Sequence, residues 1–155
     1  MTARSALLPL LAASLLVATA CNDATKDQTL FGATLSGANE VPARPSAATG
    51  AASFALDGDT VFFSVDVRQI NEVIMAHIHS GAAGVNGPVR VDLFLGPATG
   101  TVNGLLAEGT FTAANVRGVT FEELLEQMRS GAAYVNVHTT QFPSGEVRGQ
   151  VQLNQ

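Results

Sequence analysis

The sequence has one cysteine and few charged side chains. Cys21 has no second cysteine with which to form an intrachain disulfide, so core packing alone must hold the fold together. The eight lysines and arginines are scattered singly among 13 acidic residues, and the formal net charge is -5. This distribution argues against nucleic-acid binding, which needs a basic face, and against a polybasic membrane patch. Hydrophobic residues make up 46% of the 155-residue chain, which suits one domain and a leader.

The longest apolar run lies at the N-terminus, over residues 7–17, and is too short for a convincing transmembrane helix. Arg4 precedes this run and small residues, 18–20, follow it, which predicts a secretory signal peptide over residues 1–20. "VATAC" resembles a bacterial lipobox and predicts lipidation of Cys21, whereas an ordinary signal peptidase would leave a free thiol. We expect an exported, membrane-anchored lipoprotein of the bacterial cell envelope, facing the periplasm or the exterior.

The next segment, residues 21–29, is short and polar and is predicted to be a flexible tether to a domain over residues 30–155. The domain sequence consists of short alternating runs separated by turn residues. Asp57-Gly58-Asp59, between "ASFAL" and "VFFSVDV", predicts a hairpin. This pattern is typical of an all-β fold, and we predict an antiparallel β-sandwich, immunoglobulin-like or superoxide-dismutase-like.

One segment, at about residues 120–130, has the periodicity of an amphipathic helix. Its apolar residues follow the i, i+3, i+4, i+7 pattern and are Phe121, Leu124, Leu125 and Met128. Thr120 and Glu123 have the spacing of a capping box, and Gly131 is placed for a left-handed C-terminal cap. We predict one short α-helix that closes the end of the sandwich with its apolar stripe against the core.

The chain contains only three histidines, and strand alternation places all three on polar faces. Three candidate strands present such faces: His77 and His79 on the first, Tyr134, Asn136 and His138 on the second, and Glu146, Arg148 and Gln150 on the third. If these strands are neighbours, one surface carries three imidazoles, a carboxylate and a guanidinium. Glu40 is a candidate partner for Arg148.

Three long motifs occur in order: "GANEVP", "AHIHSGAAGVNGPV" and "GAAYVNVHTTQFPSGEVRGQV". In these motifs the chain resembles the CHRD domain, the module repeated in chordin and also found alone in bacterial exported proteins. The resemblance covers most of residues 30–153 and implies a β-sandwich domain. For bacterial members it implies no established activity.

The histidine spacing suggests a metal site. His77 and His79, at i and i+2 on a strand, aim their imidazoles the same way, and His138 from an adjacent strand would complete three nitrogen ligands. Such a set suits one copper or zinc ion with a position left open. Copper–zinc superoxide dismutases are loosely similar in using a His-x-His strand and a distant histidine. This chain lacks their further histidines, so a binuclear site is not expected. Asn136, Glu146 and Arg148 would support the ligands.

Other interpretations remain open. In one, the histidines are purely structural and form a buried hydrogen-bond network that sets strand register. The loops over residues 39–50 and 81–88 would then bind a protein partner. A mononuclear metal oxidoreductase is a further alternative. No catalytic residues are predicted, because the serines lack a Ser-His-Asp context and no lysine or helix follows the glycines of residues 81–87. We favour a non-enzymatic binding protein.

Overall fold

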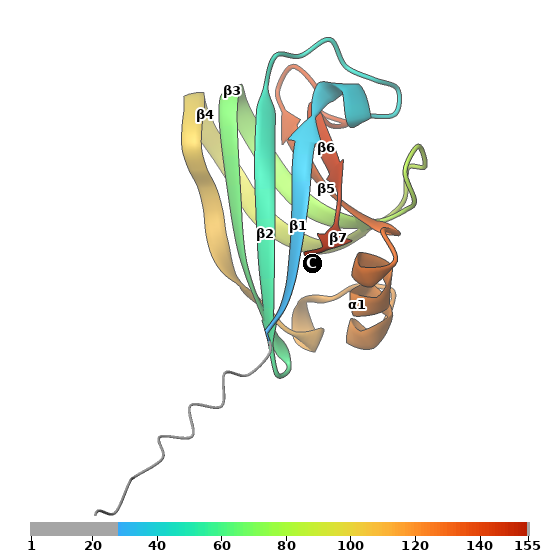
Figure 1. Cartoon of the computed structure of the whole chain (residues 1–155). Coiled ribbons are helices and arrows are strands. Elements are labelled where there is room, and N and C mark those ends of the chain that lie inside the picture. Colours follow the sequence, from blue (N-terminus) through green and yellow to red (C-terminus); the bar gives the residue numbers. More distant parts are fainter. Residues whose placement is uncertain (1–27, 155) are drawn as a thin grey trace, which may run out of the picture.

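The computed structural model describes residues 28–154 (Figure 1). Its strands are β1 (Thr29–Ser36), β2 (Thr49–Asp57), β3 (Thr60–Ser80), β4 (Val89–Phe111), β5 (Ala133–Thr139), β6 (Val147–Gln150) and β7 (Gln152–Leu153). Its helices are α1 (Phe121–Arg129) and two short 3-10 turns, η1 (Gly37–Asn39) and η2 (Ala113–Asn115). Among the described residues, no helix has the length and hydropathy needed to cross a membrane.

Five antiparallel strands close into a barrel, in the order β1, β2, β3, β5 and β6, with β6 returning to β1. The strand β4 pairs outside this ring with β3, and β7 pairs with β1. The all-β class and the single α-helix are therefore confirmed. The strands do not divide into the two separate sheets of the predicted sandwich, because β3 pairs with both β2 and β5 and joins them into one ring.

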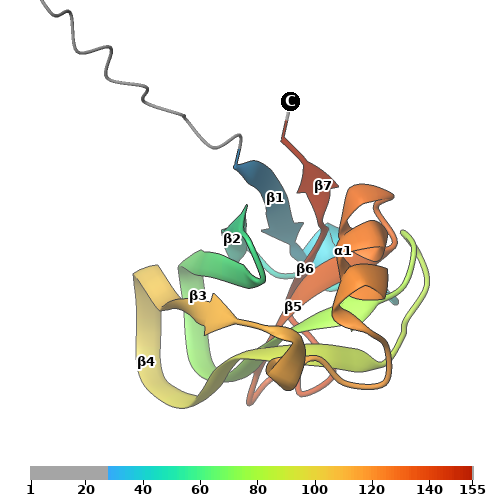
Figure 2. The same ribbon diagram turned by 90° about the horizontal axis from the view of Figure 1, so that it is seen from below.

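The strand β3 makes this closure possible because it is long and bent. Residues 60–68 pair with β2, whereas residues 73–80 pair with β5. Between these two parts, Gln69 and Glu72 have φ angles of 54° and 51°, and the pairing with β4 shifts register on either side. Bulges of this kind sharply bend and twist a strand. The bend carries β3 around a corner of the barrel, as seen from below in Figure 2.

The local predictions of a hairpin and a helix are confirmed. Asp57 and Thr60 pair across the β2–β3 turn, where Gly58 has a φ of 58°. The helix α1 begins after Thr120, whose side chain accepts from the Glu123 amide in a capping box. The four apolar residues of its stripe are buried and belong to the hydrophobic core. The helix lies beside β5 and β7 in Figure 2.

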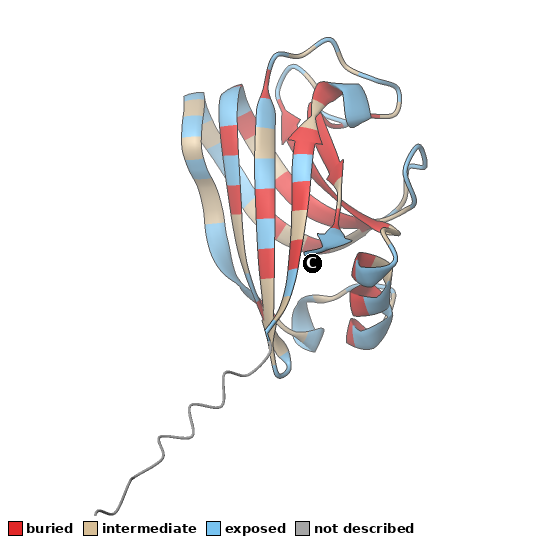
Figure 3. Ribbon diagram, viewed as in Figure 1, coloured by how far each residue is buried: buried red, intermediate tan, exposed pale blue. Residues whose placement is uncertain are grey.

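Side chains on the inward faces of the strands fill the barrel and form the hydrophobic core. Exposed and buried residues alternate along β1, β2 and the first half of β3, whereas every residue of β5 is buried (Figure 3). Because every residue of β5 is buried, other parts of the chain must cover the face of β5 that points away from the core. Within the described residues, the core cluster and the strand pairings lie between residues 29 and 153, so this segment contains a hydrophobic core and a closed ring of strands.

Candidate metal centre

The polar faces of β3, β5 and β6 lie side by side, as the alternation suggested. His77 is opposite Asn136, which is opposite Arg148 on β6. One step along, His79 is opposite Tyr134. The residues between them, such as Ile78, are buried in the core. The three strands therefore present one polar surface on the side turned away from the core.

Two connections bury this surface. Residues 81–88 follow β3, and residues 140–146 connect β5 to β6. His77, His79 and His138 are only 6%, 8% and 7% exposed. Since polar groups are buried only when they have partners or bind something, each ring nitrogen needs an explanation.

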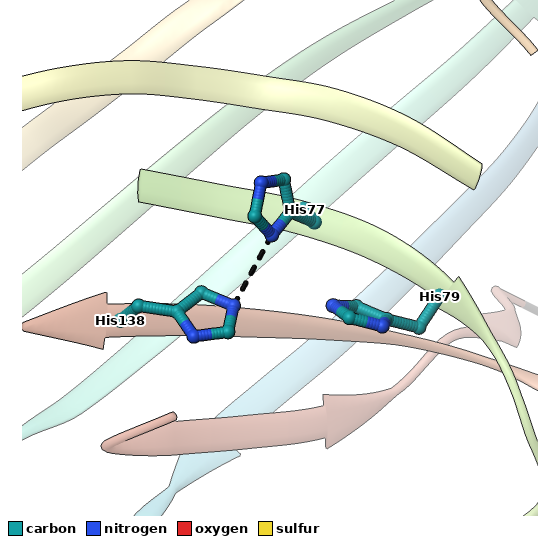
Figure 4. A group of neighbouring side chains, drawn as sticks. All are labelled: His77, His79 and His138. Atoms are coloured by element: carbon teal, nitrogen blue, oxygen red, sulfur yellow. Dashed lines mark hydrogen bonds between the residues drawn. The ribbon is translucent and has the colours of Figure 1, made fainter. Parts of the chain in front are cut away.

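The three imidazoles lie close together, with His77 and His138 in contact and His79 beside them, as Figure 4 shows. His77 Nδ1 lies 3.1 Å from His138 Nε2. One ligand atom from each histidine can be chosen so that all three lie within 4.8 Å of one another. His138 is 61 positions from His77 in the sequence, and the β3–β5 pairing brings them together. The predicted grouping of the three histidines is confirmed, and the group could hold a metal ion.

Backbone carbonyls orient two of the rings. His79 Nδ1 lies 2.9 Å from the Gly87 carbonyl oxygen, and His138 Nδ1 lies 3.0 Å from that of Pro143. A carbonyl oxygen only accepts, so each Nδ1 carries the hydrogen and each Nε2 of a neutral ring has a lone pair. Each Nε2 therefore presents a lone pair, and that of His138 faces His77 Nδ1.

The third ring is hydrogen-bonded to His138. A neutral His77 with its hydrogen on Nδ1 donates to the lone pair of His138 Nε2 at 3.1 Å. Its Nε2 then carries a lone pair and lies 3.6 Å from an Asp92 carboxylate oxygen, beyond hydrogen-bond distance. A metal ion bound here would take the place of the hydrogen between His77 and His138.

One buried ring nitrogen has no hydrogen-bond partner among the described residues. This atom is His79 Nε2. Burying an unpaired polar atom costs about 1–3 kcal/mol. A cation between the rings would bind this nitrogen.

The electrostatic surroundings keep the rings neutral. Burial, together with the neighbouring His138 and His79, lowers the pKa of His77 to about 4. Burial also lowers the pKa values of His79 and His138, against the opposing effect of their carbonyl hydrogen bonds. Neutral imidazoles are the form that binds metals, so protons compete weakly for these nitrogens near neutral pH.

Arg148 holds the covering segment in place. It is 1% exposed and stacks over Tyr134, with its guanidinium carbon 3.4 Å from the ring centroid. Tyr134 in turn stacks on His79 at a centroid distance of 4.8 Å. The guanidinium also donates to acceptors in the segment over residues 81–88 and on β6: the carbonyls of Ala82 and Val85 and the side chains of Asn86 and Gln150. Arg148 thereby supports the segment whose carbonyl orients His79.

Asn136 and Glu146 make their hydrogen bonds to groups other than the imidazoles. Asn136 Nδ2 donates to Glu40 Oε1 at 2.6 Å, and burial raises the pKa of Glu40 to about 7 against the opposing effect of Arg148. Glu146 accepts from Thr139 at 2.7 Å and from Ser46 at 2.6 Å. These bonds tie the segments around residues 40–46 and 140–146 to the sheet.

The acceptors beside the rings were not anticipated. In "VRVDLFL" the alternating pattern places Asp92 on the polar face of its strand. Its position beside His77, however, depends on the β3–β4 register. The carbonyls of Gly87 and Pro143 belong to loops, whose paths strand alternation does not determine. A Cβ on Gly87 would collide with the Ser80 carbonyl, so a glycine is required for that loop to pass so close to β3.

The fold and site together define a closed antiparallel barrel with a buried three-histidine cluster on its wall. The sequence profile of the CHRD domain matches residues 31–151, so the chain belongs to the CHRD-domain family. The matched span contains all three histidines and the residues around them. A comparison with curated proteins found no match.

Proposed function

We propose that this CHRD domain binds one copper or zinc ion through His77 Nδ1, His79 Nε2 and His138 Nε2. The observation that carries the proposal is His79 Nε2, a buried ring nitrogen that makes no hydrogen bond within the described residues and lies beside two further imidazoles. The Nδ1 hydrogens of His79 and His138 point to carbonyls, which leaves the Nε2 lone pairs of both rings facing inward. A cation would satisfy all three inward nitrogens.

The dimensions of the cluster support this proposal. Zinc and copper bind imidazole nitrogens at about 2.0–2.1 Å, which places two tetrahedral ligands about 3.3 Å apart. His77 Nδ1 and His138 Nε2 are 3.1 Å apart, so they need almost no movement. The ligand atoms of the three histidines are up to 4.8 Å apart, so some of these distances must shorten when an ion binds. Rotation of the His79 side chain toward the other two rings would shorten them.

The acceptors on the outer nitrogens also suit a metal site. Ligating histidines commonly donate their second N–H to a carboxylate or a backbone carbonyl, which sets the ring orientation. Gly87 and Pro143 supply such a carbonyl to His79 and His138, and the Asp92 carboxylate lies 3.6 Å from His77 Nε2. Exposures of 6–8% give the histidines little contact with solvent, which favours storage or delivery of a bound ion over an open oxidoreductase centre.

The proposed setting is the bacterial cell envelope. Cys21 and the predicted signal peptide lie outside the described residues, so export and lipidation rest on the sequence. Expression of the full chain in a bacterium, with mass spectrometry of its membrane fraction, tests this part. Lipid on Cys21, and transfer of a Cys21→Ser variant to the soluble fraction, are expected. An unmodified Cys21 in the soluble fraction of the parent would contradict the anchor.

The test of metal binding uses residues 22–155, which include the hydrophobic core and the closed ring of strands and exclude the Cys21 thiol. The protein is exposed separately to copper and zinc, dialysed and analysed for bound metal. We expect about one equivalent in the parent and none in a His77→Ala/His79→Ala/His138→Ala variant, because three ligands hold one ion. Circular dichroism must show that the variant is folded. An absence of metal in the folded parent would contradict the proposal.

A structural role is the second candidate function. The 3.1 Å contact between His77 and His138 is also a hydrogen-bond distance, so the histidines alone could join β3 to β5. Under that interpretation the protein binds a partner protein through its loops, and Val85, which is 54% exposed, would take part. The same metal measurement separates the two candidates.

A further inference from the structure

The strand β3 carries one more potential ligand on the histidine face. Met75 precedes His77 by two residues in a regularly paired segment, so the two share a face. Val73 is opposite Thr139, and Met75 is opposite His138, so Ile74 is an extra residue in β3. The pairing with β4 shifts at the same place. This bulge separates Met75 from the core face on which Val73 is buried.

Met75 is therefore a direct neighbour of the cluster. Residues opposite each other on antiparallel strands have Cβ atoms about 4.5–5.5 Å apart on the same face. Met75 has this relation to His138 and precedes His77 by two residues on β3. The methionine side chain has three rotatable bonds and adapts to irregular spaces. Met75 is only partly buried, and its neighbour on β4, Leu95, is 72% exposed, so Met75 is at the solvent-exposed margin of the histidine face.

We propose that the Met75 thioether is the fourth ligand and that the ion is copper, bound as Cu(I). This proposal rests on the proposed function and names the metal. Thioethers are soft ligands that select Cu(I), whereas zinc in proteins is bound by nitrogen, oxygen and thiolate. Three imidazoles and one thioether form a set that suits Cu(I) and that is not a usual zinc site.

The charge of the cluster points to the same ion. The four ligands are neutral, and the nearest carboxylate, that of Asp92, is already paired with Arg117. The cost of removing an ion from water rises steeply with its charge, and a neutral ligand set compensates less of that cost. A singly charged ion is therefore favoured over a doubly charged one in this buried position.

The experiment compares three forms of residues 22–155: the parent, Met75→Leu and Met128→Leu. Met128 is the matched control because it is the other methionine in this segment and is buried in the core of α1. Cu(I) affinity is measured under ascorbate by competition with bicinchoninate, and zinc affinity by competition with a chromophoric chelator. Substitution at Met75 is expected to weaken Cu(I) binding at least about tenfold, with little effect on zinc binding. Loss of a residue that merely hydrogen-bonds to a metal ligand already lowers metal affinity about 10–100-fold.

A second measurement does not depend on any variant. X-ray absorption of the Cu(I)-loaded parent should show a sulfur neighbour, and Met75 and Met128 are the only sulfur-containing residues in this segment. Loss of that sulfur signal in Met75→Leu, with retention in Met128→Leu, is the expected result. A nitrogen-only environment, or unchanged Cu(I) affinity in Met75→Leu, would overturn the thioether ligand and leave the three-histidine site standing. Absence of all metal binding would overturn both.

Discussion

Replacement of Glu40 by glutamine should stabilise the protein at alkaline pH. Glu40 is 7% exposed, and burial raises its pKa from 4.5 to about 7. Between these two values the folded state binds more protons than the unfolded state. The contribution of Glu40 is therefore fully present below the unfolded pKa and is lost as the pH rises through the folded pKa.

The magnitude follows from the difference of about 2.5 pKa units. At 1.36 kcal/mol for each unit, ionised Glu40 lowers the free energy of unfolding by about 3 kcal/mol well above pH 7. Glutamine has no charge to bury, and its oxygen can still accept from Asn136 Nδ2, which now lies 2.6 Å from Glu40 Oε1. Glu40→Gln should therefore match the parent near pH 4.5 and exceed it by up to about 3 kcal/mol near pH 9.

Urea unfolding of the metal-free protein at several pH values measures this difference. Glu126→Gln is the matched control, because the Glu126 side chain is 71% exposed and its carboxylate lies 3.7 Å from Arg129 in an i, i+3 ion pair on the helix surface. The control should change the free energy of unfolding by less than about 0.5 kcal/mol at every pH. A Glu40→Gln variant that is less stable than the parent near pH 9, or whose advantage does not change with pH, would refute the reasoning.

Three further substitutions test the structure around the site. Arg148→Leu should lower the free energy of unfolding, measured in urea, by about 3 kcal/mol or more, because several buried acceptors lose their donor. It should also speed hydrogen exchange in residues 81–88, and unchanged exchange would contradict the supporting role of Arg148. Gly87→Ala should displace the carbonyl that orients His79, and an unchanged His79 NMR signal would contradict this. Thr120→Ala should cost about 1 kcal/mol in thermal unfolding through loss of the helix cap, and an unchanged melting temperature would argue against the cap.

The parts of the fold that could be predicted from sequence depend on local chemistry. The helix followed from the spacing of Leu124 and Met128 and from the cap at Thr120. The hairpin followed from Gly58, where a positive φ is needed. Alternation also placed His77 and Ile78 on opposite faces of β3, because that relation requires only a regular strand.

The parts that could not be predicted depend on pairing between distant segments. Alternation is the same in a sandwich and in a barrel, so it could not show that β3 pairs with both β2 and β5. The contact of His138 with His77 was conditional on a β3–β5 pairing that no local pattern specifies. Alternation places Met75 on the face of His77, but only the β3–β5 register shows that Met75 is opposite His138. The acceptors from Asp92 and Pro143 likewise depend on register and loop path.

The position of a bound ion is the most direct test of the proposed metal site. A crystal structure of residues 22–155 grown with copper, with anomalous data collected at the copper edge, would locate it. We predict one anomalous peak about 2.0–2.2 Å from His77 Nδ1, His79 Nε2 and His138 Nε2. A structure with no peak between these atoms, and with His77 and His138 still in direct contact at 3.1 Å, would contradict the proposal.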